Sequence, residues 1–267
     1  MREQFKANLR AHILYYRRSR LLLAFALVFL GMTLLYSLPA LFSPLQGAAF
    51  SAAREIFTTL NMFLTAFSAG LGLFIVSSHL RDRNLKMVFT KPCPPEWWLA
   101  SAYLSAVLVS ALVNAAILAC ALAVSLVAHA KIQAGLAFVS LDTFAGSLAL
   151  TAYFMFLAMI IHPVIAVVFA LVFNPSIFYH MQIWTQALIN SGAGGAFLRL
   201  VERLFHILYM TFPMVHPFSR ETSGIENSLR VETGHWHYAF YSLGYALALT
   251  ALSYCLSLFF LRRKKLI

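Results

Sequence analysis

The sequence predicts an all-α integral membrane protein with six transmembrane helices, on the strength of three observations. Hydrophobic residues make up 61% of the 267 residues and charged residues only 11%, whereas a soluble domain carries roughly a quarter charged residues. The apolar residues gather in runs long enough to cross a bilayer, which takes about 20 helical residues. The basic residues behind the net charge of +11 lie beside these runs. That placement orients membrane proteins and does not indicate nucleic acid as a partner.

The first element is expected to be an amphipathic helix over residues 1–20. Six basic residues and one acidic residue occur here, with Phe5, Leu9, Ile13 and Tyr16 at helical spacing. This pattern is typical of a helix on the cytoplasmic membrane surface. A secretory signal peptide is the competing interpretation, but the basic region is long for one and the apolar run that follows reaches spanning length.

The remaining chain, 21–267, is expected to form one membrane domain. Its predicted spans are 21–38, 56–77, 98–128, 143–161, 163–189 and 238–261. The third run has 31 residues and must tilt or project from a hydrocarbon core of about 30 Å. His162-Pro163 leaves two interpretations open, a tight turn between two spans or a kink in one long helix. With a kink, 201–218 would supply the next span.

The distribution of Lys and Arg predicts the orientation. With six spans, fourteen of these residues fall on the side of the two termini and six on the other, which predicts that both termini are cytoplasmic. The longest outer loop, 190–237, opens with the flexible NSGAGGA and continues into a predicted interfacial helix. Its apolar face holds Leu198, Val201, Leu204, Phe205 and Leu208, and its polar face holds Arg199, Glu202, Arg203 and His206.

The chain carries no motif for its own energy supply or for enzyme chemistry. It has no Gly-rich phosphate loop and no hydrolase or zinc-protease motif, and its three cysteines are scattered. A metal at His216, His235 and His237 is only weakly indicated, and we expect neither metal nor cofactor. Asp142 is expected at a span boundary, so no acid or base is expected at membrane depth.

Small and polar residues line three predicted span faces. One explanation is packing within one subunit, and the other is a subunit interface or translocation path, for which Asn61 and Asn114 are the better candidates. The faces comprise Asn61, Thr65, Ser68 and Gly72 in the second span, Ser110, Asn114, Ala121 and Ser125 in the third, and Gly244, Ala248, Ala251 and Cys255 in the last.

The loop 79–97 is the only well-charged segment between two long apolar runs. Up to Phe89 its spacing suits a short amphipathic helix, with Leu80, Met87 and Val88 opposite the charges. Three prolines follow, and Trp97-Trp98 opens the next run, where indoles favour the membrane interface. A loop that only fixes orientation is the simpler explanation.

The loop resembles the first cytoplasmic loop of ABC-2-type ABC transporter permeases. The matching residues are Asp82, Leu85, Met87 to Phe89, Thr90-Lys91-Pro92 and Glu96, although Ala100-Ser101 replaces the family's usual Gly-Lys and Cys93-Pro94-Pro95 makes a stiffer turn. The span count, span order and basic C-terminus agree in outline. The ATPase-coupling residues that this resemblance implies are Asp82, Arg83, Leu85, Lys86, Met87, Phe89, Lys91, Pro92 and Glu96.

The resemblance implies the membrane-spanning subunit of an ABC exporter in a bacterial-type inner membrane. Its partners would be two cytoplasmic ATPase subunits, which bind ATP and Mg²⁺, and a second permease chain, identical or related. The alternative is a non-transporting structural or assembly subunit of a membrane complex. The transported substrate is left open.

Overall fold

The structure is a computed structural model, and almost all of the residues that it describes are helical. It describes residues 2–18, 20, 22–24, 26–31, 35, 60, 64, 67–68, 70–74, 76, 94–127, 134–162, 165–166, 175–193, 195–211 and 235–263. No strand occurs among them, so the all-α prediction is confirmed for this part of the chain. The elements are α1 (Arg2–Arg18), α5 (Pro95–Val127), α6 (Ala134–Ile160), α8 (Pro175–Leu188), the π-helical turn η1 (Ile189–Ala193), α9 (Ala196–Thr211) and α11 (Trp236–Arg263).

Among the described residues, three helices are long and apolar enough to cross a membrane, as expected of a membrane protein. They are α5, α6 and α11, and they correspond to the predicted third, fourth and sixth spans. The described residues at 22–31 and 60–76 are also helical. The predicted spans 21–38, 56–77 and 163–189 lie partly outside the described residues.

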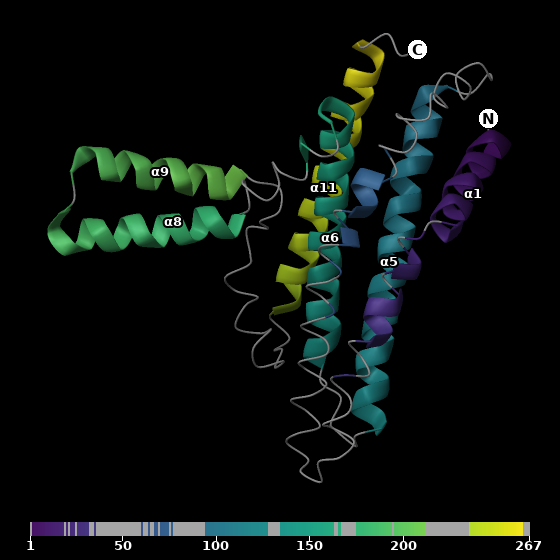
Figure 1. Cartoon of the computed structure of the whole chain (residues 1–267), viewed down its shortest axis with the longest axis horizontal. Coiled ribbons are helices and arrows are strands. Elements are labelled where there is room, and N and C mark those ends of the chain that lie inside the picture. The colour runs from purple at the N-terminus through teal and green to yellow at the C-terminus, as the bar shows by residue number, and fades with distance from the viewer. Residues whose placement is uncertain are drawn as a thin grey trace.

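Helix α6 lies between α5 and α11 and contributes more buried apolar residues than any other described helix. It runs parallel to α11, since Phe138 contacts Trp236 at a ring-centroid distance of 5.8 Å and Phe156 contacts Phe260 at 6.0 Å. Figure 1 shows α5, α6 and α11 side by side, with α1 alongside the start of α5.

Helix α5 runs antiparallel to α11. The hydroxyl oxygens of Tyr103 and Ser257 are 2.9 Å apart. Glu96, two turns before Tyr103, binds Arg262, which lies five residues after Ser257. The helix begins at Pro95, a residue that suits the first helical position. Its 33 residues extend about 50 Å, which is longer than a hydrocarbon core of about 30 Å. The first part of α5 packs on α1, so this is the part that projects beyond the core.

Helix α6 begins at Ala134, nine residues earlier than predicted. Asp142 therefore lies in the third turn of a candidate span and is 4% exposed. The expectation that no span carries a buried acid is wrong. The sequence misled because a charged residue normally marks a span end, whereas the apolar stretch 134–141 extends the helix past Asp142.

The chain leaves the α6 helix at Ile161. Hydrogen bonding resumes one residue later, where the N–H of Ala166 donates to the carbonyl oxygen of His162 at 2.9 Å. The parallel pairing of α6 and α11 puts Ile160 and Trp236 at opposite ends of the bundle.

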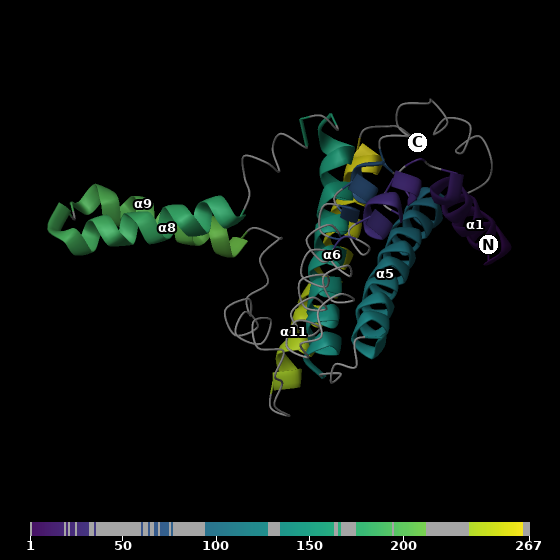
Figure 2. The same ribbon diagram turned by 60° about the horizontal axis from the view of Figure 1, so that its bottom comes forward.

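Helices α8 and α9 form an antiparallel hairpin closed by η1. Figures 1 and 2 show it projecting to one side of the bundle, with its long axis across the direction of the bundle helices. The 14 residues of α8 extend about 21 Å, which is less than a hydrocarbon core. The described helix thus covers only the second half of the predicted span 163–189.

Candidate functional site

One end of the bundle joins three helices that are far apart in sequence. We call it the basic end, and it comprises α1, residues 94–103 of α5 and residues 254–263 of α11. Arg262 donates to the carboxylate of Glu96, and the Tyr254 hydroxyl donates to the backbone carbonyl oxygen of Glu96 at 3.2 Å. Both partners of the ion pair are partly exposed, so the pair contributes at most about 1 kcal/mol. The ion pair mainly fixes the end of α11 beside the start of α5.

Aromatic contacts hold α1 on the bundle. Phe5 meets Trp97 edge-on at 5.6 Å between ring centroids, and His12 meets Trp98 at 5.8 Å. Tyr16 is 1% exposed, and its burial raises the pKa of the phenol well above its usual value, despite a hydrogen bond that acts in the opposite direction. The predicted helix is confirmed, and it uses Phe5 and Tyr16 from its apolar face to pack on protein.

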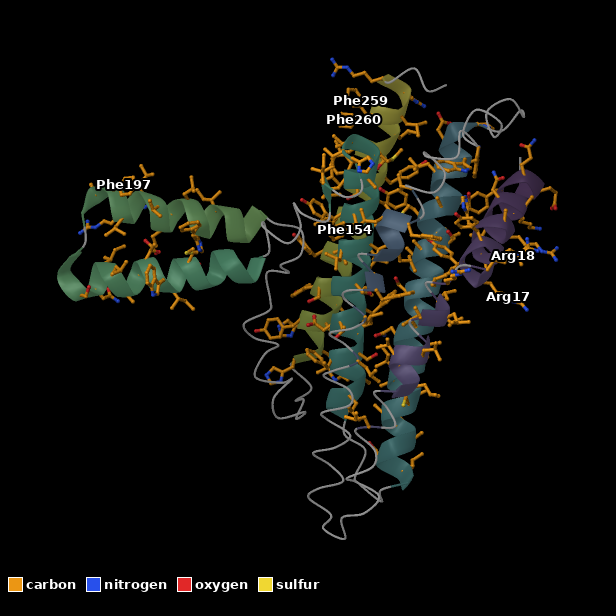
Figure 3. All side chains as sticks on the ribbon, viewed as in Figure 1. Arg17, Arg18, Phe154, Phe197, Phe259 and Phe260 are labelled. Atoms are coloured by element: carbon orange, nitrogen blue, oxygen red, sulfur yellow. The ribbon has the colours of Figure 1, made fainter. Side chains whose placement is uncertain are left out.

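The opposite side of α1 stays open. Ile13 is exposed, and Figure 3 shows Arg17 and Arg18 pointing away from the bundle at the end of the helix. Helix α1 therefore presents cationic side chains outward while its other side is fixed to α5.

Of the nine predicted coupling residues, only Glu96 is described. It does not point away toward a partner but binds Arg262 within the chain. The other eight lie outside the described residues: Asp82, Arg83, Leu85, Lys86, Met87, Phe89, Lys91 and Pro92. The loop 79–97 therefore enters the bundle at the basic end, through a residue that is anchored to α11.

A groove between α5 and α6 is lined by Asn114, one of the residues predicted for a translocation path or subunit interface. The Asn114 side-chain amide donates to Ser140, 2.9 Å to its hydroxyl oxygen and 3.2 Å to its carbonyl oxygen. The Oδ1 atom of Asn114 is buried and has no hydrogen-bond partner among the described residues. The groove has a volume of about 270 Å³ and is lined by Ala111, Asn114, Ala115, Leu118, Ala137, Ser140, Leu141 and Phe144.

The lining of the groove is mainly apolar, so it favours an occupant with an apolar body. The unpaired Oδ1 atom of Asn114 is unfavourable, but it is buried, and an occupant would reach it only after the Asn114 side chain moves. Ser110, one turn away on α5, is also buried, and its hydroxyl has no partner within the part of the chain that the structure describes.

The predicted face of the second span packs against α6 within the chain. Thr151 donates its hydroxyl hydrogen to the carbonyl oxygen of Ser68 at 3.2 Å. A Cβ atom added to Gly72 would lie only 2.5 Å from the carbonyl oxygen of Thr151. Ser68 and Gly72 therefore serve helix packing, while Asn61 and Thr65 lie outside the described residues.

The small residues of α11 behave differently. Gly244, Ala248, Ala251 and Cys255 are all exposed, and a Cβ atom added to Gly244 would meet nothing within 4 Å. These four residues, which we call the α11 stripe, are not used for packing among the described residues. Among the described residues, packing within one subunit accounts for Ser68 and Gly72 of the second span but not for the α11 stripe.

No group of three or more His, Cys, Asp or Glu that could hold a metal occurs among the described residues, and His216 lies outside them. No protein-family profile matches the chain, and no curated protein matches it. Sequence reasoning missed Arg262, Tyr254 and His12 as partners at the basic end. No local pattern identifies them, since Glu96 and Arg262 are 166 residues apart.

Proposed function

We propose that the chain is the permease subunit of an ATP-driven ABC exporter. It would form the translocation path and be coupled through the loop 79–97 to separate ATPase subunits, which bind ATP and Mg²⁺. The observation that supports this most is the anchoring of Glu96. The loop ends at a residue bound to α11, and the next two residues, Trp97 and Trp98, hold α1.

This anchoring provides a physical route for force. Packed side chains transmit displacement because a protein interior is dense and hardly compressible. A push on the loop would move the start of α5, the end of α11 and α1 as one unit. Helix α6, packed between α5 and α11, would then experience a change in its two interfaces, one of which contains the Asn114 groove.

The Asn114 groove is the better candidate for the translocation path. It is open and largely apolar, which suits a substrate with an apolar body. The face of Ser68 and Gly72 is a weaker candidate because it is occupied by α6.

The α11 stripe supports a second permease chain, identical or related, as a partner. Small side chains let membrane helices approach closely, and this stripe is open to such an approach. The membrane would be a bacterial-type inner membrane with both termini in the cytoplasm. This orientation is supported by the fourteen-to-six distribution of basic residues and by the common location of α1 and the end of α11.

The test is a pair of loop variants compared in the assembled complex. The double variant Leu85→Ala with Phe89→Ala removes two apolar side chains from the proposed contact. Truncating such a side chain typically weakens binding by more than about 1–2 kcal/mol. The chain should still insert, but it should lose its ATPase in a pull-down and lose transport-linked ATP hydrolysis. Arg83→Ala is the matched control and should cost less than about 1 kcal/mol.

The outcome also separates the two functional candidates. If the double variant retains its ATPase and transports normally, the loop only fixes orientation and the transporter proposal loses its support. A wild-type chain that copurifies with membrane subunits but with no ATPase would instead favour the structural or assembly role.

A further inference from the structure

The α8–α9 hairpin has a polar seam between its two helices. Gln182 and Thr185 of α8 are buried, and Nε2 of Gln182 donates to Nδ1 of His206 of α9 at 3.1 Å. On α9, Val201 and Phe205 are half-buried on the side that packs against α8. The predicted apolar face of this helix is thus only partly used by the hairpin.

Each helix of the hairpin has a second, exposed apolar arc. At about 100° per residue, the arc on α8 covers about 60° and the arc on α9 about 80°. The largest exposures belong to Phe197 at 77% and Trp184 at 68%. The arcs are formed by Met181, Trp184 and Leu188 of α8 and by Phe197, Leu200, Leu204 and Ile207 of α9.

The two arcs lie on the same face of the hairpin. On each helix, the centre of the exposed apolar arc is rotated about the helix axis by roughly 100–130° from the residues of the polar seam. Viewed along each helix from its N-terminus, the rotation has the same direction in both helices. Because the helices are antiparallel and meet along the seam, equal senses of rotation bring the arcs to one side. Figure 3 shows Phe197 on this hairpin near the end farthest from the bundle.

The opposite face of the hairpin is polar and cationic. Gln186, Asn190 and Arg199 are exposed there, Glu202 is half-buried on the same side, and Arg203 is exposed at the outer edge of α9 next to Ile207. Ile183 is the one large apolar exception among the described side chains. No ion pair joins Arg199 or Arg203 to any residue that the structure describes. Both arginines are available to an external anion.

We propose that the α8–α9 hairpin lies in the plane of the bilayer interface. Its apolar face would be immersed among the acyl chains, and Arg199 and Arg203 would contact anionic lipid headgroups. Trp, Phe and Leu opposite a cationic face are the composition of interfacial helices. This inference does not depend on coupling to ATP.

Three further observations indicate that the exposed apolar face of the hairpin is covered by a bilayer and not by a protein. The hairpin is connected to α6 and α11, both candidate spans, so the bilayer surface is within reach of both its ends. Its helices, of 14 and 16 residues, are only about 21–24 Å long and too short to span. It also extends across the direction of the bundle helices (Figures 1 and 2), as an element in the membrane plane would.

Spin labels on the full-length chain test the placement. In a background with the three native cysteines replaced, the single variants Met181→Cys and Leu204→Cys are compared with the matched controls Gln186→Cys and Asn190→Cys. The protein is reconstituted in phosphatidylcholine vesicles containing one quarter phosphatidylglycerol. All four native side chains are exposed, so none of the substitutions removes a buried contact.

The proposal predicts opposite collision preferences for the two pairs. Labels at 181 and 204 should collide with oxygen rather than a nickel chelate and report a depth of about 5–10 Å, whereas labels at 186 and 190 should favour nickel. Nickel access at all four positions would place the hairpin in water. Labels at 181 and 204 shielded from both reagents would show a protein contact, for example a second copy. Either result overturns the proposal.

The headgroup contact is tested in the Leu204→Cys background. Removing phosphatidylglycerol, or introducing Arg199→Gln with Arg203→Gln, should raise nickel access at 204, since each arginine strengthens binding to an anionic surface about fivefold. Replacing both arginines by lysine is the control and should restore the shielding. Equal nickel access with and without phosphatidylglycerol would refute the role of the two arginines.

Discussion

Replacing Gly72 by alanine tests the packing of the second predicted span on α6. The added Cβ would lie 2.5 Å from the carbonyl oxygen of Thr151, 3.1 Å from Cβ of Phe154 and 3.2 Å from the backbone nitrogen of Met155. Two of these three atoms belong to the backbone of α6, so no side-chain rotation can relieve the contact. The two helices must move apart.

The required movement sets the expected cost. A carbon–oxygen contact normally has a separation of about 3.3–3.6 Å, so the helices must separate by roughly 0.8–1 Å. Overpacking of this kind costs about 1–3 kcal/mol, and the hydrogen bond from Thr151 to Ser68, already 3.2 Å long, would lengthen. The higher helix propensity of alanine offsets up to about 1 kcal/mol. We expect a net destabilisation of about 1–2 kcal/mol.

Gly146→Ala in α6 is the matched control. Its added Cβ would meet nothing within 4 Å, so the substitution should be neutral or stabilising by up to about 1 kcal/mol. The free energy of unfolding of each variant is measured in mixed detergent micelles by tryptophan fluorescence. If Gly72→Ala unfolds at the same denaturant concentration as Gly146→Ala, the close approach to Thr151 is not real.

Three more predictions concern the other contacts. Gly244→Leu should leave the stability of the single chain within about 0.5 kcal/mol but reduce the size of the native assembly in gel filtration, and an unchanged size would show that the α11 stripe faces lipid. Arg262→Gln should cost less than about 1 kcal/mol yet speed hydrogen exchange of the first turn of α5, and unchanged exchange would mean that the Glu96 contact does not hold this turn. Burial raises the pKa of Tyr16, so the packing of α1 should be stable below about pH 10, the usual tyrosine pKa, and should weaken above it as the unpacked helix ionises. Tyr16→Phe should keep α1 resistant to proteolysis at higher pH than the wild type, and equal loss in both would exclude Tyr16 ionisation as the cause.

The elements with a strong periodic or compositional signal were predictable from the sequence. The helical spacing of Phe5 and Tyr16 predicted α1, and long apolar runs predicted α5, α6 and α11. Their boundaries were less accurate because charge was used as the marker of a span end. Asp142 shows the weakness of that marker, since a single carboxylate can be buried when neighbouring helices cover it.

The pairing of faces could not be predicted from the sequence. Gly72 and Gly244 both lie in stripes of small residues, yet one is pressed against α6 and the other meets nothing within 4 Å. The difference depends on which helix lies opposite, a long-range property. The predicted apolar face of α9 is likewise divided. One part packs against α8, and the other part is exposed.

The burial of Asp142 has a consequence for biogenesis. An aspartate at the centre of a span raises the cost of insertion by about 2.5–3.5 kcal/mol, which is an upper bound for Asp142 in the third turn. Helix α6 is therefore a poor candidate to enter the bilayer stably on its own. Its most extensive partner is α11, the last described helix to leave the ribosome. Helix α6 must therefore remain incompletely covered until α11 has been synthesised. A chain shortened before Trp236 would expose this helix, and membrane quality-control proteases would be expected to degrade it.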